Sequence, residues 1–318
     1  MNKPTRDNSL DTVAGIMTIY MIFNHVFVFT STTESELFLK QLCILGFFMH
    51  WFFFKAGMFY KPSADYKVLA VKKYKRLIIP YLVFAIIGQI AHSVLLIVKG
   101  DYNITHHTLK PLEYIFTTGA PSGISPLWFL FSLFGATLLF NYIITKKRWL
   151  LFAIIVIIPF LLIYTKPYWI ANICVGIIFI FLGYKLKELQ YNNYIFVVSI
   201  ILYLLLQTLY PSAVHMRANH AAFGSYILFY PIALFGIISI NNIFKRIRYN
   251  FPLLSWVGRN SMGFYLIHWV IMTLVETVFV LLSVNNLQLY TISLAVANIV
   301  FIPPLIYVIK KSRYSNII

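Results

Sequence analysis

Long apolar runs, separated by charged or turn-forming residues, most constrain what this chain can fold into. An α-helix needs about 20 apolar residues to cross the hydrocarbon core of a bilayer. Runs of about this length occupy residues 10–30, 37–58, 77–98, 127–145, 149–165, 168–184, 194–210, 222–241, 260–283 and 287–309. The fifth and sixth are the weakest, because only Thr165-Lys166-Pro167 separates them. We therefore expect an all-α integral membrane protein, a bundle of about ten transmembrane helices.

Composition supports this fold class. Hydrophobic residues make up 60% of the chain and charged residues 11%, whereas about a quarter of the residues of a soluble domain are charged. The sequence therefore argues against a soluble globular enzyme, a disordered chain and a disulfide-stapled secreted domain. We expect a single membrane-embedded domain over residues 1–318, with no appended soluble domain.

The formal net charge of +17 would suggest nucleic-acid binding on a soluble protein. Here the 26 basic residues alternate between the two sides of the expected bundle, and most of them lie on the side of the N-terminus. The opposite side holds Lys40, Lys99, Lys110, Lys166 and Arg217. This bias is the positive-inside pattern. It predicts cytoplasmic N- and C-termini in a multi-pass protein of the cell (plasma or inner) membrane, with the lipid bilayer and not nucleic acid as the partner of the basic residues.

Cysteines and histidines give no sign of a metal site. Cys43 and Cys174 both fall inside apolar runs, where a cysteine is ordinarily a small buried side chain. Two such residues cannot build a disulfide framework or a zinc site. His106 and His107 lie in the long interval 99–126 and, being adjacent, point to different sides of any regular element. We expect no metal.

Ionisable residues inside membrane spans are costly and normally face a partner or a water-filled interior. In the first run, Asp11, Thr18 and His25 are seven residues apart, so they share one helix face. Asp11 and His25 are about 21 Å apart along that face and cannot hydrogen-bond to each other. His25 is either a hydrogen-bonded histidine of the bundle or a functional group.

A second polar face lies along the ninth run, with its residues spaced by four, three, four and four positions. It contains Ser261, Tyr265, His268, Met272 and Glu276. Glu276 is either kept protonated by burial or paired with a cation, and a structural hydrogen bond is as good an explanation as catalysis. Gly258-Arg259-Asn260-Ser261 precedes this run and suits a helix start capped by Asn or Ser.

The predicted cytoplasmic mouth is basic. Lys55 lies inside an apolar segment, and Lys72, Lys73, Lys75 and Arg76 lead into the third run. Such a charge run either reports topology alone or binds an anionic cytosolic ligand, such as a nucleotide-phosphate cofactor, by charge-assisted hydrogen bonds. Two classes of protein fit these patterns: a membrane enzyme that uses a cytosolic anionic donor, or a transporter with a proton-linked histidine.

Five short motifs, in order over residues 10–268, resemble the acyltransferase 3 family of membrane O-acyltransferases. They are Leu10-Asp11 followed by His25, Phe52-Phe53-Phe54-Lys55-Ala56-Gly57, Arg76-Leu77-Ile78-Ile79-Pro80-Tyr81, Pro126-Leu127-Trp128-Phe129-Leu130, and Gly258-Arg259-Asn260-Ser261 with Tyr265 and His268. The resemblance implies transfer of an acyl group, usually acetyl from cytosolic acetyl-CoA, to a hydroxyl of a cell-surface polysaccharide or its lipid-linked precursor. Acetyl-CoA would be a co-substrate, with no permanently bound cofactor.

The resemblance also implies roles for individual residues. The family's essential histidine corresponds to His25, and its basic start of the third span corresponds to Arg76. Many members carry an arginine eleven residues before the histidine, where this chain has Ala14; either Lys55 or Arg76 supplies that charge, or the donor is engaged differently. A separate extracytoplasmic transferase passes the acyl group on, or the glycan is acylated directly.

These patterns together give a set of candidate site residues. The catalytic candidates are His25, which either activates the acceptor hydroxyl as general base or relays the acetyl group, with Asp11, Ser261, Tyr265 and His268. The donor-binding candidates are Lys55, Lys73 and Arg76, and the acceptor-binding candidates are Trp128, Arg217, Glu276 and Asn260. The unperturbed pKa of a histidine, about 6.5, suits proton transfer at neutral pH. Asn260, Ser261 and Tyr265 are also candidates for stabilising the developing oxyanion. The alternatives are a transporter or flippase of an envelope glycan or small metabolite, and a structural membrane subunit.

Overall fold

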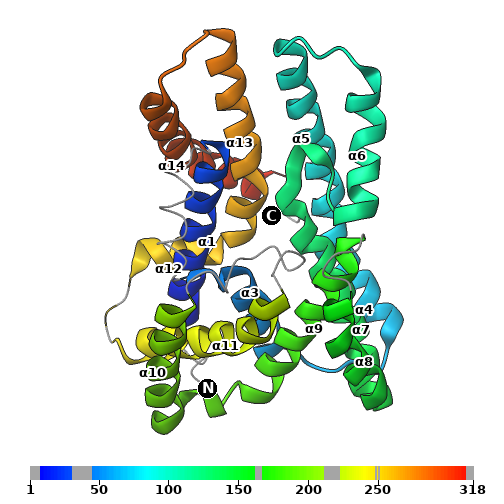
Figure 1. The fold of residues 1–318 in the computed structure, drawn as a ribbon, viewed down its shortest axis with the longest axis vertical. Helices are drawn as coiled ribbons and strands as arrows, with labels where there is room; N and C mark the ends of the chain where they lie inside the picture. The colour runs from blue at the N-terminus through cyan, green and yellow to red at the C-terminus, as the bar shows by residue number, and fades with distance from the viewer. Residues whose placement is uncertain are drawn as a thin grey trace.

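The structure is a computed structural model, which describes residues 8–30, 45–161, 167–210, 223–247, 249 and 251–312. Within these ranges every regular element is a helix (Figure 1). The predicted all-α class is therefore confirmed.

A helix is present in each of the ten predicted runs. These are α1 (Asn8–Phe29), α3 (Phe48–Met58), α5 (Ile79–Val98), α7 (Trp128–Lys146), α8 (Trp149–Leu161), α9 (Tyr168–Leu186), α10 (Asn193–Leu209), α11 (Phe223–Arg246), α13 (Ser261–Leu281) and α14 (Leu287–Lys311). In the described part of the chain, seven helical stretches are long and apolar enough to cross a membrane. Helices α3, α8 and α10 are shorter, with 11, 13 and 17 residues. The count of about ten spans stays a prediction.

Shorter helices connect the long ones. They are α4 (Tyr66–Lys73), the π-helix η2 (Tyr74–Ile78), α6 (Ile104–Thr118), the 3-10 helices η3 (Ser122–Leu127) and η4 (Leu189–Tyr191), and α12 (Pro252–Arg259). The interval 99–126, treated above as a gap between spans, thus contains a helix of 15 residues, α6. It begins where the Asn103 side chain accepts a hydrogen bond from the Thr105 backbone N–H, an N-cap that satisfies one of the first free amides.

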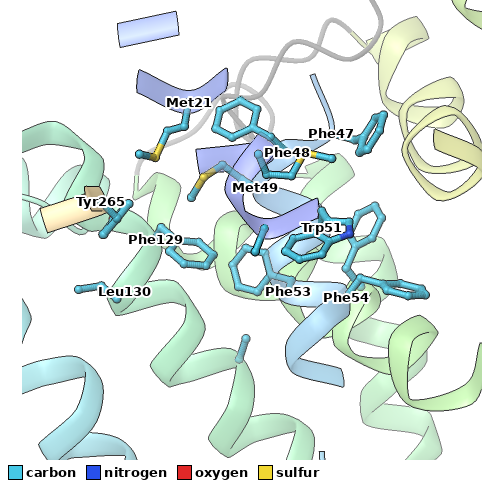
Figure 2. Close-up of a cluster of buried hydrophobic side chains, with 14 of the residues drawn as sticks. Met21, Phe47, Phe48, Met49, Trp51, Phe53, Phe54, Phe129, Leu130 and Tyr265 are labelled. Carbon is cyan, nitrogen blue, oxygen red and sulfur yellow. The ribbon is translucent and has the colours of Figure 1, made fainter. Parts of the chain in front are cut away.

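Helix α3 lies in the middle of the molecule, and its aromatic side chains form the core. Trp51, Phe53 and Phe54 are almost completely buried, and Figure 2 shows them gathered with Phe129 of α7 and Tyr265 of α13. The Phe53 and Phe129 rings meet edge to face, with their centroids 4.9 Å apart. Buried rings of this size contribute much of the apolar area removed from solvent. The aromatic-rich second motif therefore packs among α1, α7 and α9, and a Cβ atom on its Gly57 would collide with the Ile180 carbonyl of α9.

Helices α1 and α12 approach each other closely because two glycines face backbone carbonyls. A Cβ atom on Gly258 would collide with the Asp11 carbonyl, and one on Gly15 would collide with the Leu254 carbonyl. The Thr12 and Ser255 hydroxyls, 2.9 Å apart, hydrogen-bond across the same contact. Nearby, the Trp51 indole N–H donates to the Asn241 side-chain oxygen over 2.7 Å, which ties α3 to α11. This end of the molecule is closely packed.

Polar contacts pair segments that the charge pattern assigns to the same side. Tyr60 and the Ser63 amide both donate to the Asn141 side-chain oxygen, and the Lys310 ammonium donates to that of Asn260. At the opposite end of α13, Lys99 pairs with Glu276. The alternation of sides agrees with the predicted topology. Which side is cytoplasmic stays a prediction.

Candidate active site

The two polar faces predicted from the sequence meet at a pair of histidines. His25 Nδ1 of α1 lies 2.8 Å from His268 Nε2 of α13. The two rings are nearly parallel, with an interplanar angle of 12° and centroids 4.9 Å apart. His268 is fully buried, whereas His25 is half-buried. The structure therefore brings together two of the predicted catalytic residues that are far apart in the sequence.

Hydrogen bonding determines which nitrogen of each ring carries the proton. His268 Nδ1 lies 3.1 Å from the Phe264 carbonyl oxygen, which can only accept, so this nitrogen is the donor. In a neutral imidazole the other nitrogen then accepts. His268 Nε2 thus accepts from His25 Nδ1–H, and His25 Nε2 keeps a lone pair that can take up a proton. The arrangement prepares His25 to act as a base.

Aromatic rings surround this pair. The Trp269 indole meets the His25 ring edge to face, with centroids 5.2 Å apart. Phe29, one turn after His25 on α1, also packs against Trp269, with ring centroids 4.8 Å apart. Sequence reasoning missed Trp269, although it directly follows the histidine of the last motif. These rings cover the side of His25 that faces the end of α1.

Tyr265 joins two of the sequence motifs. Its hydroxyl donates to the Pro126 carbonyl, at the start of the motif that leads into α7. Its ring lies 5.7 Å from that of Phe129 and 6.3 Å from that of His268. The single hydroxyl hydrogen is therefore used in holding α13 against η3 and α7. Trp128, predicted to stack on a sugar, is half-buried with its ring 6.1 Å from that of Phe129.

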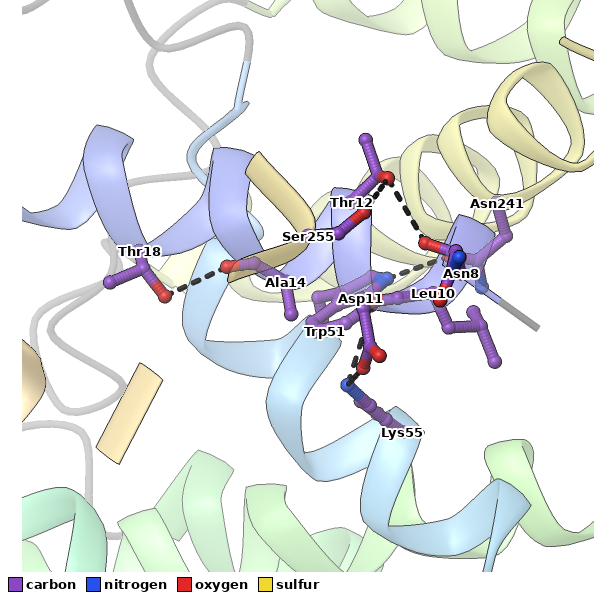
Figure 3. Close-up of polar contacts among 10 residues, drawn as sticks. All are labelled: Asn8, Leu10, Asp11, Thr12, Ala14, Thr18, Trp51, Lys55, Asn241 and Ser255. Carbon is purple, nitrogen blue, oxygen red and sulfur yellow. Dashed lines mark hydrogen bonds and ion pairs between the residues drawn. The ribbon is translucent and has the colours of Figure 1, made fainter. Parts of the chain in front are cut away.

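Asp11 and Lys55 form an ion pair at the start of α1, as Figure 3 shows. Lys55 Nζ is 3.9 Å from Asp11 Oδ1 and 3.5 Å from the Leu10 carbonyl oxygen, to which it donates. It also lies over the Trp51 ring, 5.1 Å from its centroid. The Asp11 side chain is 6% exposed and that of Lys55 23%. Because α1 is continuous, Asp11 is about 21 Å from His25 along the helix axis, as expected.

The residues before α13 have structural contacts. Asn260 donates from Nδ2 to the Trp256 carbonyl over 2.7 Å, and its side-chain oxygen accepts from Lys310. The helix start predicted here is confirmed, with Asn260 at the N-cap position of α13, but neither Asn260 nor Ser261 forms a side-chain capping bond there. Ser261 is the first residue of α13 and is half-buried. Seven residues separate it from His268, about 10 Å along the helix, so Ser261 and Asn260 lie well below the histidine pair.

Two further basic candidates lie on the segment leading into α5. Lys73 ends α4 and is half-buried, and Arg76 is exposed within η2. A π-helical turn inside a helix is rare and recurs at functional sites.

The side chain at position 14, where many family members have an arginine, is fully buried, and the Ala14 carbonyl accepts from the Thr18 hydroxyl over 2.7 Å.

Glu276 meets a cation, one of the two alternatives left open above. The Lys99 ammonium of α5 donates to Glu276 Oε1 over 2.6 Å. Sequence reasoning counted Lys99 only as a charge of the outer side.

Arg217, predicted to bind the acceptor, lies outside the described residues, as does Cys43. Cys174 is buried with a free thiol, as the sequence indicated.

One buried histidine escaped the sequence reasoning. His50 of α3 is 1% exposed, and its ring lies 4.6 Å from Phe179 and 4.3 Å from Phe229. Neither ring nitrogen has a hydrogen-bond partner among the described residues. The signal was present, since His50 is an ionisable residue in an apolar run, as His25 is. Within the same ranges no three His, Cys, Asp or Glu residues are grouped as metal ligands would be.

Comparison with known proteins gives one result. A family model described as an acyltransferase domain matches residues 7–307. Neither the curated proteins nor the solved structures give a significant match. The family match covers the His25–His268 pair, the Asp11–Lys55 and Lys99–Glu276 ion pairs and all five motifs.

Proposed function

Because this chain belongs to the acyltransferase family whose model it matches, as its motifs indicated, we propose that it moves an acetyl group from cytosolic acetyl-CoA to a hydroxyl of a cell-envelope glycan. Family membership together with the long apolar helices makes it a membrane acyltransferase. The donor, the acceptor and the cell membrane as its location are parts of the proposal. Family membership favours this enzyme over the transporter and the structural subunit.

The hydrogen-bonded pair of His25 and His268 carries the proposal. His25 Nε2 takes the proton from the acceptor hydroxyl as its oxygen attacks the thioester carbonyl carbon. The new carbon–oxygen bond forms, the carbon–sulfur bond breaks, and the proton passes from His25 to the departing thiolate of coenzyme A. General base catalysis of this kind contributes about 10²- to 10⁴-fold to a rate.

His268 acts in this scheme by holding His25. The Phe264 carbonyl fixes His268 as the acceptor, which fixes the proton of His25 on Nδ1 and makes Nε2 the basic nitrogen of that ring. When His25 becomes an imidazolium, its Nδ1–H bond to His268 becomes charge-assisted and stronger. We therefore assign His268 a positioning role.

Lys55, Lys73 and Arg76 are proposed to bind the phosphates of the donor, because ammonium and guanidinium groups match phosphate oxygens. Lys55 contacts Leu10 and Asp11, one turn before Ala14 on the same helix. This contact supports Lys55 as the residue that supplies the charge which other members place at position 14. Asp11 then orients Lys55, and its part in catalysis is indirect.

Tyr265 and Asn260 are already engaged with the Pro126 and Trp256 carbonyls. We assign them to the positioning of α13 and no longer to the oxyanion. Transfer directly to the glycan and transfer through a separate extracytoplasmic transferase both fit the position of His25, which lies toward the end of α1 away from the predicted cytoplasmic mouth.

The test uses purified full-length protein in lipid nanodiscs with labelled acetyl-CoA. His25→Ala should lower the rate of donor turnover about 10²- to 10⁴-fold, the range of a lost general base, while the unfolding temperature stays close to that of the wild type. His106→Gln, in the exposed first turn of α6, is the matched control and should keep full activity. In cells, the His25→Ala strain should lose envelope acetyl groups by mass spectrometry. Full acetylation by that strain would contradict the assignment.

A further inference from the structure

An open cavity of about 480 Å³ lies at the far end of α1 and α13. Its lining includes Phe29 of α1, Lys99 of α5, Glu276 of α13, Ser283 and Asn286 of the loop before α14, and Tyr290 of α14. Pockets that bind small ligands have volumes of about 300 to 1,000 Å³. The cavity is therefore large enough for one sugar unit or two.

The cavity borders the histidine pair. Phe29 lies one turn beyond His25 on α1 and packs on Trp269, which in turn packs on the His25 ring. Glu276 lies eight residues after His268 on α13, about 12 Å along the helix. A molecule held in the cavity thus lies within the length of one or two sugar rings of His25, the proposed base, on the side away from Asp11 and Lys55.

The chemistry of the lining is that of a carbohydrate site. The Lys99–Glu276 pair provides a charged donor and a charged acceptor, which bind hydroxyl groups more strongly than neutral partners do. The Tyr290 hydroxyl is buried and has no hydrogen-bond partner among the described residues, which is costly unless a ligand satisfies it. The Phe279 and Tyr290 rings, 5.1 Å apart, offer apolar surface to the C–H faces of a sugar.

We infer that this cavity is the subsite for the acceptor, and that it binds a neutral sugar unit of the glycan. The inference rests on the proposed function. Neutrality follows from the lining, since the described part of the chain contributes one ammonium and one carboxylate to it, and these cancel each other. A uronate or a sugar phosphate would leave an uncompensated negative charge beside Glu276.

Binding of methyl glucoside and methyl glucuronide, as matched neutral and anionic probes, tests the inference by saturation-transfer NMR on the full-length protein in nanodiscs. The neutral probe should bind more tightly. Glu276→Gln should weaken its binding about tenfold, as expected for one charge-assisted hydrogen bond. Glu113→Gln is the matched control, because Glu113 forms an exposed pair with Lys110 outside the cavity, and it should leave binding unchanged.

Tyr290→Phe separates binding from a merely structural role. Removing an unsatisfied buried hydroxyl should leave the unfolding temperature unchanged or raise it, yet weaken the neutral probe several-fold. Four results would overturn the inference. The anionic probe binds more tightly, wild type and Glu276→Gln bind the neutral probe equally, or neither probe binds. In the fourth, glycerophosphoethanolamine, a lipid headgroup, displaces the sugar. Donor turnover without acceptor is measured on the same samples. If the wild-type protein does not turn over the donor at all, that result would instead count against the proposed function.

Discussion

A pair of one acid and one lysine lies near each end of helix α1, in opposite surroundings. At its start, Asp11 and Lys55 lie where α1, α3 and α12 pack closely, with side chains 6% and 23% exposed. Near its other end, Glu276 and Lys99 lie beside an open cavity, with side chains 24% and 43% exposed. An acid and a lysine thus lie among closely packed helices at one end and beside an open cavity at the other. Packing, more than residue type, decides how exposed such a pair is.

The histidine pair lies between these two ends. Toward the start of α1 the backbones of α1 and α12 are in contact through Gly15 and Gly258, and toward its other end Phe29 and Trp269 lead to the cavity. In the proposed reaction the donor approaches His25 from the first side and the acceptor from the second. Three sets of measurements test how different the two ends are.

The largest effect is expected from a methyl group at the closely packed end. In Gly258→Ala the new Cβ would collide with the Asp11 carbonyl, which belongs to a helix backbone and cannot move aside. We expect a loss of at least about 3 kcal/mol in unfolding free energy, at the upper end of overpacking effects, measured by thermal unfolding in nanodiscs.

Gly100→Ala is the control at the open end. No atom lies within 4 Å of the new Cβ, and only the backbone strain of φ +83° remains, which costs about 1 kcal/mol. Equal losses in the two variants would show that the ends do not differ in packing.

A smaller effect is expected from removing each lysine charge in turn. Lys55→Met leaves the buried Asp11 carboxylate without its lysine, and we expect about 2 kcal/mol of destabilisation, less than for a fully buried pair because Lys55 is partly solvated. Lys99→Met removes the partner of a more exposed carboxylate and should cost less than about 1 kcal/mol.

The same two variants separate the substrates. Lys55→Met should raise KM for acetyl-CoA, whereas Lys99→Met should raise KM for the acceptor. The reverse pattern would assign the donor to the open end and contradict the comparison.

The smallest effect concerns an exposed acid at the open end. The His106 ring donates to the Asp101 carboxylate over 2.6 Å, and this bond, followed by that from the Asn103 amide, lowers the pKa of Asp101. A lowered folded-state pKa means that the contribution to stability is present above the pKa of the unfolded chain and is lost as the pH falls through the folded-state value.

His106→Gln should therefore raise the pKa of Asp101 toward its ordinary value, followed by NMR titration of the carboxyl carbon. An unchanged Asp101 pKa would show that the histidine contributes nothing to it.

Much of the fold followed from particular patterns in the sequence. In the described part of the chain each of the ten apolar runs contains a helix, because a chain in lipid must satisfy its backbone within each segment. The seven-residue spacing of Asp11, Thr18 and His25 correctly excluded a direct Asp11–His25 contact. Helix α6 was missed because its apolar residues are interrupted by His106, His107, Lys110 and Glu113, so the run is too short and polar to be recognised as a span.

The candidate site was harder to predict. His25 and His268 were each identified as candidates, but nothing in the sequence specified that they touch. Lys55 was identified as unusual without its partner Asp11, and Glu276 without Lys99. Tyr265 was assigned to the oxyanion, although its hydroxyl is committed to Pro126, because a side chain's partner across helices cannot be read from its own helix.

By itself, the sequence determined that this chain is a helical membrane protein of an acyltransferase family and which few polar residues its apolar helices must accommodate. Periodicity and hydrophobicity are local properties, and they suffice for that. Only the tertiary structure decided which residues meet: two histidines 243 positions apart share a hydrogen bond, and one acid–lysine pair is enclosed while the other borders a cavity. The physical reason is that the proton position on a histidine ring and the exposure of an ion pair both depend on neighbouring side chains. Those neighbours come from other helices, and packing between distant segments of the chain decides which they are.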